Sequence, residues 1–267
     1  MIPDDLRRNP WFHFGLALRI AAILMLVPAV QAEWYTPFMA HSLAAPTLDP
    51  WTCYLQRTGE LPAFFAGPVM YLFHAPFVGL GMLLDQVAGS RPALAQIGLG
   101  LSLLVADYGL LLALRRMQPD AEERLLLAYW LSPLVLFITY WHGDTDVVPT
   151  MLMVLSLVLL RQGVPGKAGM VLGLGIGAKI SILAILPFLV VFLWSHRRHR
   201  DTLPRFLSST AIVSTLLVGL PLLLSPAVQQ MLLMNPKLLV ANPGMLSILD
   251  VDITAGAGHK LYIMPVF

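Results

Sequence analysis

The sequence has few charged residues and almost no cysteine. Lys, Arg, Asp and Glu make up only 12% of its 267 residues, and Cys53 is the single cysteine. One cysteine excludes an internal disulfide. A formal net charge of +2 with no basic stripe excludes electrostatic nucleic-acid binding. Because the chain is 57% hydrophobic, with a mean hydropathy of +0.74, a soluble domain is excluded as well.

The sequence instead contains a series of apolar segments long enough to cross a membrane. It predicts an all-α fold, a polytopic transmembrane helix bundle that forms a single domain over residues 1–267. The more polar stretch 33–62 is expected to be the first outer loop, and 225–267 a C-terminal outer segment that leads to a further helix. About seven spanning segments are expected, at 12–32, 66–87, 94–114, 125–140, 147–160, 168–194 and 206–224.

Basic residues predict the orientation of these segments, because loops rich in Lys and Arg face the cytoplasm. On this basis 33–62 and His142–Asp146 lie on the far side of the membrane. Three crossings between Arg8 and Arg115 would place Arg115 outside, so either 66–87 is re-entrant or Arg115 and Arg116 break the rule. The basic clusters are Arg7-Arg8, Arg115-Arg116 with Arg124, Arg161 with Lys167, and Arg197-Arg198 with Arg200 and Arg205.

Lys179 interrupts the apolar segment 168–194, which is flanked by positive charge at both ends. A charge near the bilayer centre costs roughly 2.5 to 3.5 kcal/mol, so it marks a candidate functional site. We expect two short half-helices that meet at Lys179, with its side chain on the same face as Asp144 and Asp146. A lysine there suits a phosphate contact as a point charge. Gly173, Gly175 and Gly177 match no phosphate loop and are expected to permit close helix packing.

Asp49 lies in the long outer loop, in Leu48-Asp49-Pro50-Trp51. A carboxylate there could be a general base that deprotonates an acceptor hydroxyl, a role worth roughly 10²- to 10⁴-fold in rate. The alternative is a helix cap, because Asp followed by Pro commonly begins a helix.

The turn His142-Gly143-Asp144-Thr145-Asp146 contains a D-x-D pair, a pattern that can hold a divalent metal against phosphate oxygens. Asp144 and Asp146 are therefore metal candidates, with Mg²⁺ or Mn²⁺ as the cofactor. The alternative is that the pair caps the helix that begins near Val147.

Three further polar residues lie inside apolar segments. Arg19 and Asp107 predict an interhelical ion pair or a water-filled cavity, because an unpaired charge there is costly. His74 is expected to be a hydrogen-bonded histidine of the bundle.

The order of these features resembles the GT-C superfamily of integral-membrane glycosyltransferases, especially the polyprenyl-phosphate-sugar-dependent mannosyltransferases, including those of glycosylphosphatidylinositol synthesis. The similarity covers roughly residues 12–195. Its motifs, in chain order, are Asp49, Gly59, Phe64-Phe65-Ala66-Gly67-Pro68, Asp107, Leu131-Ser132-Pro133-Leu134, His142-Gly143-Asp144-Thr145-Asp146, Ala168-Gly169-Met170-Val171-Leu172-Gly173, Lys179 and Pro187.

This resemblance implies transfer of a mannose-like hexose or a pentose from a polyprenyl-phosphate donor to a lipid or glycan acceptor at the outer face of the membrane. It implies that Asp49 is the catalytic base and that Lys179 and His142–Asp146 lie near the donor phosphate or the acceptor. The first loop has a single Asp49 where a paired Asp-x-Asp or Glu-x-Asp is the family pattern. Such proteins also continue with further helices, so we expect a truncated product or a protein partner that supplies them.

Two other classes of function stay open. A lipid or solute transporter would also use broken helices and an intramembrane lysine, and would place its site at the midplane between repeated halves, which are not detected. A non-catalytic scaffold subunit or an inactive fragment needs no base in the first outer loop, so Asp49 discriminates between the classes. The short loops and the absence of a recognisable sorting signal favour the bacterial inner membrane.

Overall fold

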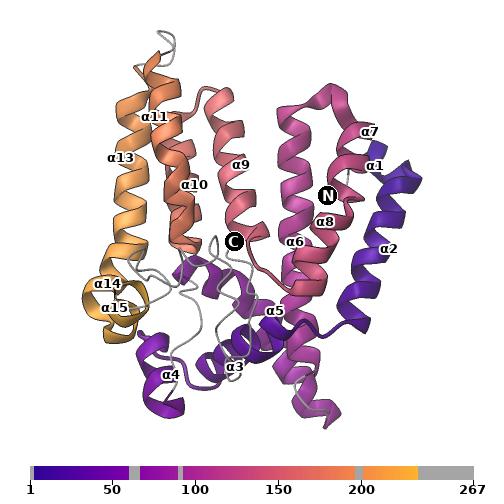
Figure 1. Ribbon diagram of the computed structural model, residues 1–267, viewed down its shortest axis with the longest axis vertical. Helices are drawn as coiled ribbons and strands as arrows, with labels where there is room; N and C mark the ends of the chain where they lie inside the picture. The colour runs from indigo at the N-terminus through magenta and orange to yellow at the C-terminus, as the bar shows by residue number, and fades with distance from the viewer. Residues whose placement is uncertain (1–2, 60–66, 90–92, 196–200, 234–267) are drawn as a thin grey trace, which may run out of the picture.

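The computed structural model describes residues 3–59, 67–89, 93–195 and 201–233. Every regular element in these ranges is a helix, and none is a strand, which confirms the all-α class. The helices form a bundle in which long upright helices stand above a layer of shorter ones (Figure 1). Arg197, Arg198, Arg200 and the greater part of the expected C-terminal segment, residues 234–267, lie outside the described residues.

The N-terminal part of the chain contains one upright helix and a group of short ones. Asn9 begins α2, since its side chain accepts a hydrogen bond from Trp11 N at 3.0 Å and Pro10 follows. The Asp49-Pro50 pair begins α4 in the same way, and Gly59, with φ of +74°, ends it. The elements are α1 (Asp4–Arg8), α2 (Pro10–Met25), the π-helical turn η1 (Gln31–Tyr35), α3 (Thr36–Ala44) and α4 (Pro50–Thr58).

An antiparallel hairpin of α5 (Pro68–Ala88) and α6 (Ala93–Met117) follows. Glycines permit its close packing: a Cβ on Gly81 would collide with the backbone of Leu94, and one on Gly98 with the backbone of Phe77. The Asp85 carboxylate accepts hydrogen bonds from Leu94 N and Ala95 N at 3.1 and 2.9 Å, which caps the start of α6.

The next segment descends as two pieces that are bent by 48° relative to each other. The bend lies at Ser132-Pro133, because proline cannot donate the hydrogen bond that would continue the first piece. The pieces are η2 (Pro119–Ala121), α7 (Glu122–Leu125) and η3 (Leu126–Trp130), followed by α8 (Pro133–Leu136) and η4 (Phe137–His142).

The C-terminal part of the described chain is a group of helices around a glycine-lined contact. Gly169, Gly173 and Gly177 of α10 face α13 and η6, where added Cβ atoms would collide with Phe206, Val213 and Leu217 respectively. This confirms that the glycines permit close packing, although Gly175 points elsewhere. The elements are α9 (Val147–Arg161), α10 (Pro165–Ala178), η5 (Ile180–Ile185), α11 (Leu186–Ser195), α13 (Leu203–Ser214), η6 (Thr215–Gly219), α14 (Leu220–Leu224) and α15 (Pro226–Leu233).

Fewer helices reach membrane-spanning length than the seven expected from hydropathy. Three of those described are long and apolar enough, Pro68–Ala88, Ala93–Met117 and Leu203–Leu224, and a fourth is the bent pair Pro119–Trp130 with Pro133–His142. The expected spans at 12–32, 147–160 and 168–194 become shorter apolar helices. A membrane protein is thus consistent with the structure, whereas seven full spans are not confirmed.

Most of the basic residues of the described chain lie on helices or connections at one end of the bundle, the upper end in Figure 1. The exceptions are Arg57 of α4, the buried Arg19, and Lys179. Arg115 pairs with Glu122 at 2.8 Å, and Arg161 Nη1 donates to Met117 O, which joins the ends of α6 and α9. Helix α5 starts beside α10, where Gly67 N donates to Ala178 O at 3.1 Å, and ends at the start of α6. Its length and hydropathy still make it a spanning candidate, so the choice between a re-entrant 66–87 and an exception at Arg115-Arg116 stays a prediction.

Helix α9 extends only part of the way along α6. The two helices are packed side by side, and the Arg161–Met117 hydrogen bond joins their upper ends. With 15 residues against 25, and a rise of 1.5 Å per residue, the lower end of α9 stops about 15 Å short of the lower end of α6. The polar turn before α9 therefore lies at the middle height of the bundle.

Candidate functional site

The candidate site lies where two helices stop at this middle height. Helix α10 ends at Ala178, Lys179 is extended (φ −147°, ψ 121°), and the 3₁₀ turn η5 and α11 return toward the basic end. This confirms the expected half-helices that meet at Lys179. The chain reverses at Lys179. Both ends of the segment 168–194 therefore lie on the basic side of the bundle, which explains the positive charge on either side of it in the sequence.

The Lys179 ammonium forms an ion pair with Asp146, as expected from their predicted shared face. Both side chains are partly exposed: 28% of the Lys179 side chain and 38% of the Asp146 side chain are accessible. A pair that is open in this way can exchange partners with a ligand, which a sealed pair cannot do.

Asp144 and Asp146 form the two sides of a tight turn. Asp144 Oδ1 accepts a hydrogen bond from Asp146 N at 3.1 Å, which closes the turn just before α9, but no described side chain caps the first N–H groups of that helix, so the capping alternative is not confirmed. The Asp146 side chain makes no capping bond and contacts Lys179 instead. Burial raises the pKa of Asp146, the nearby Asp144 carboxylate raises it further, and Lys179 lowers it.

His142 and the metal prediction receive less support. His142 ends η4, where Gly143, with φ of +88°, turns the chain, and the His142 side chain makes no hydrogen bond or ion pair within the described ranges. No group of three or more His, Cys, Asp or Glu side chains gathers in those ranges. Metal binding at Asp144 and Asp146 stays a prediction.

Asp49 caps α4, as the alternative reading expected. Its Oδ1 accepts hydrogen bonds from Thr52 N at 3.1 Å and from Ser225 Oγ at 2.8 Å. Ser225 in turn precedes α15, where its hydroxyl accepts from Val228 N at 3.3 Å, so the two helix starts share one network. In the part of the chain that the structure describes, no hydrogen bond or ion pair links Asp49 to Lys179 or Asp146.

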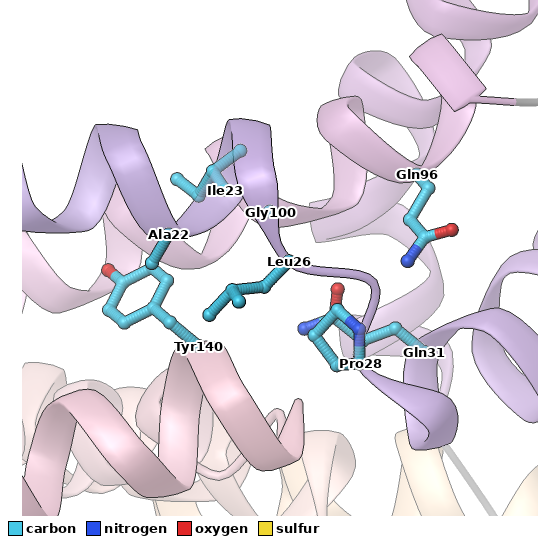
Figure 2. Close-up of a pocket in the computed structure, with 8 residues that line it drawn as sticks. All are labelled: Ala22, Ile23, Leu26, Pro28, Gln31, Gln96, Gly100 and Tyr140. Atoms are coloured by element: carbon cyan, nitrogen blue, oxygen red, sulfur yellow. The ribbon is translucent and has the colours of Figure 1, made fainter.

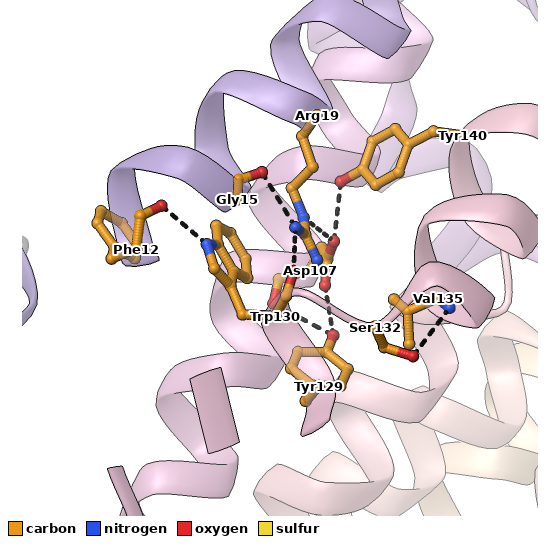
Figure 3. A network of polar contacts seen from close by, with 9 residues as sticks. All are labelled: Phe12, Gly15, Arg19, Asp107, Tyr129, Trp130, Ser132, Val135 and Tyr140. Atoms are coloured by element: carbon orange, nitrogen blue, oxygen red, sulfur yellow. Dashed lines mark hydrogen bonds and ion pairs between the residues drawn. The ribbon is translucent and has the colours of Figure 1, made fainter. Parts of the chain in front are cut away.

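Arg19 and Asp107 form the predicted interhelical pair, and both side chains are fully buried. Figure 3 shows Asp107 at the centre, where it accepts from Arg19 Nε at 2.6 Å, from Tyr140 at 2.9 Å and from Tyr129. The guanidinium also donates to Trp130 O at 2.5 Å and lies 3.7 Å from the Trp130 ring centroid. This network joins α2, α6 and the bent pair, and its burial fits a structural role.

A small cavity lies between this network and the polar turn (Figure 2). It leaves about 10 Å³ for the centre of a water molecule, room for one water and far too little for a sugar. Its walls include Leu26, Gln31, Gln96 and the Tyr140 ring. A second, apolar hollow of about 200 Å³ lies between α2 and α6 and contains none of the candidate residues.

His74 is hydrogen-bonded inside the bundle, as expected, but through only one of its two ring nitrogens. Its Nδ1 lies 2.5 Å from Ser102 Oγ, but its buried Nε2 has no partner among the described residues. The structure also brings to the turn a residue that the sequence did not single out for the site, Tyr35, whose hydroxyl oxygen accepts a hydrogen bond from Thr145 Oγ1 at 3.0 Å. These two are 110 positions apart, so the only available signal was that both are polar residues beside apolar segments.

Comparison with other proteins adds no identification: no family model, no curated protein and no solved structure matches this chain.

Proposed function

We propose that the protein is a membrane glycosyltransferase that moves a sugar from a polyprenyl-phosphate donor to a lipid or glycan acceptor at the outer face. One observation carries the proposal: the Lys179–Asp146 pair is partly exposed at the end of half-height helices, away from the basic end. Broken helices tolerate polar groups at membrane depth only where protein or water lines them. A lipid phosphate would meet a cation there without leaving the membrane.

In the proposed reaction the acceptor hydroxyl oxygen attacks the anomeric carbon of the donor sugar. The bond from that carbon to the phosphate oxygen breaks, and polyprenyl phosphate leaves with the electron pair. A carboxylate takes the proton of the acceptor hydroxyl. Lys179 stabilises the charge that develops on the leaving phosphate, and the resemblance assigns the base to Asp49.

The experiment is transfer of radiolabelled sugar from a panel of polyprenyl-phosphate sugars in membranes that contain the full chain. Lys179→Ala is expected to abolish transfer, whereas Lys167→Ala, a lysine at the opposite end of the bundle, is the matched control and should leave it unchanged. Folded protein with no transfer from any donor would overturn the proposal. Transfer indifferent to Lys179 would overturn the phosphate contact.

The proposed role of Asp49 as the general base can be separated from its role as the N-cap of α4. Asn is about as good an N-cap as Asp, so Asp49→Asn keeps α4 capped but removes the base. A loss of roughly 10²- to 10⁴-fold in rate with unchanged stability is expected for a base. Asp49→Ala is the comparison variant, because it removes both functions.

A second candidate function is a non-catalytic membrane scaffold. The observation that favours it is the engagement of Asp49 Oδ1 in the α4–α15 network, which gives this carboxylate a structural purpose. Normal transfer by Asp49→Asn, or none by the wild type, would favour the scaffold.

A further inference from the structure

The N-terminal loop holds the polar turn of the candidate site in place. Tyr35, the last residue of η1, accepts a hydrogen bond from Thr145, whose side chain is nearly inaccessible. Close packing adds to this bond: a Cβ on Gly143 would lie 2.5 Å from Pro28 Cβ and 2.9 Å from Gln31 Cγ. One short stretch, 28–35, thus contacts the turn at its second and fourth residues, Gly143 and Thr145.

The Tyr35 hydroxyl is suited to hold a turn that carries two carboxylates. Burial raises the pKa of Tyr35, Asp144 and Asp146 raise it further, and the hydrogen bond from Thr145 lowers it. The hydroxyl therefore stays neutral, and it adds no negative charge beside the carboxylates.

Thr145 lies between the two residues whose positions matter for the site. Asp144 bonds to the backbone of Asp146, and Asp146 bonds to Lys179. We propose that Tyr35 is a positioning residue: by holding Thr145 it keeps Asp146 against Lys179 and so sets the place of the cation that receives the donor phosphate. The last step rests on the proposed function, whereas the positioning of Lys179 does not.

The first test measures Lys179 directly, with no sugar donor. The full chain in lipid nanodiscs is treated with a water-soluble N-hydroxysuccinimide acetate ester, and acetylation of Lys179 is followed by mass spectrometry. Tyr35→Phe and Thr145→Val should each raise the rate about two- to tenfold, the range that corresponds to one lost neutral hydrogen bond. Asp146→Asn, which removes the counter-charge of Lys179, sets the upper limit of its acetylation rate. Lys167 in the same sample is the internal reference.

Matched variants show whether the bond itself is responsible. Tyr71→Phe also removes a phenolic hydroxyl, one that lies in α5 and has no hydrogen bond to the turn, and should leave the rate unchanged. Thr145→Ser keeps a hydroxyl and should behave as wild type. If Tyr35 and Thr145 act through their bond, the double variant should acetylate no faster than the faster single variant. Unchanged acetylation in both single variants, or a double variant equal to the product of the two, would overturn the inference.

The second test uses transfer and separates the inference from the proposed function. Tyr35→Phe should lower kcat/KM for the donor by about the same factor as it raises the acetylation rate of Lys179. An inactive wild type would overturn the proposed function while the acetylation result still decides the positioning of Lys179. An active wild type with the same kcat/KM for the donor in Tyr35→Phe would overturn the link between Tyr35 and the donor.

Discussion

Two ion pairs of this protein have opposite surroundings. Arg19 and Asp107 are sealed among aromatic side chains, and Asp107 accepts hydrogen bonds from three side chains. Lys179 and Asp146 are partly exposed. Since a buried charge depends on its partner while an open one can accept a new partner, the first pair suits stability and the second suits ligand binding.

Breaking the sealed pair should strongly destabilise the protein. Asp107→Asn leaves the Arg19 guanidinium buried without a counter-charge, so we expect a loss of about 3 to 5 kcal/mol in unfolding free energy. The double variant Arg19→Met with Asp107→Leu removes both charges and should lose less than Asp107→Asn. Denaturant titration in detergent measures both, and a double variant that costs more than Asp107→Asn would contradict this account.

The raised pKa of Asp146 predicts a pH dependence of stability. Because the folded state binds this proton more tightly than the unfolded state, the contribution is fully present below the ordinary pKa of 3.8. It is lost as pH rises through the higher pKa of the folded state. The Tm of the wild type relative to Asp146→Asn should therefore fall across that window.

Asp144→Asn should reduce this fall, because Asp144 is the second cause of the raised pKa. Scanning fluorimetry over a pH series measures the effect, with Asp120→Asn, an exposed carboxylate near α7, as the control. A difference in Tm that is constant with pH would refute the assignment.

At the scale of the helices, close approach depends on where glycine is present. A single face of α10, with Gly169, Gly173 and Gly177, meets α13 and η6, while Gly175 faces α9. The spacing of four residues places these three glycines on one side of the helix. Without a hydrophobic driving force in lipid, such close packing supplies much of the association between helices.

Gly169, which faces α13, and Gly175, which faces α9, predict opposite effects of one added methyl group on stability. Gly169→Ala would bring a Cβ against the Phe206 carbonyl, which is backbone and cannot rotate away, so we expect a loss of about 1 to 3 kcal/mol. In Gly175→Ala the nearest atom lies at 3.5 Å, an ordinary contact, and alanine also favours the helix, so stability should stay equal or rise. Unfolding in detergent compares the two, and equal losses would show that the helix faces are assigned wrongly.

At the scale of the whole molecule, one end of the bundle is basic and the other contains the α3–α4 layer (Figure 1). The positive-inside rule therefore predicts that the C-terminal ends of α6 and α9 face the cytoplasm and that α4 lies on the outer side. The candidate site lies between them, because α9 and α10 stop at the middle height of α6.

Cysteine labelling tests this orientation. In a Cys53→Ser background, Gln56→Cys in α4 should react with a membrane-impermeant maleimide added to intact cells. Gln118→Cys and Gln162→Cys, after α6 and α9, should react only after the membrane is opened, since both follow helices that end at the basic side. Labelling of Gln118→Cys and Gln162→Cys from different sides would contradict the arrangement.

Local features of the sequence were enough to predict the all-α fold class and the boundaries of several helices. The low charge and long apolar runs indicated an all-α membrane protein, Asp49-Pro50 indicated a helix start, and Lys179 indicated a break. Each depends on propensity, capping or composition within a few residues. Fewer of the described helices reach spanning length than hydropathy predicted, because an apolar segment such as 168–194 folds back at Lys179 into two shorter helical pieces.

What the sequence by itself determined is therefore the membrane class, the helix boundaries set by caps and prolines, and the costly charges that needed partners. Only the tertiary structure decided which contacts formed: Lys179 pairs with Asp146 rather than Asp144, Thr145 bonds to Tyr35, and Ser225 bonds to Asp49. These contacts join residues 33, 110 and 176 positions apart. No local pattern encodes them, because they depend on how far each helix extends and on where the glycine faces let helices meet.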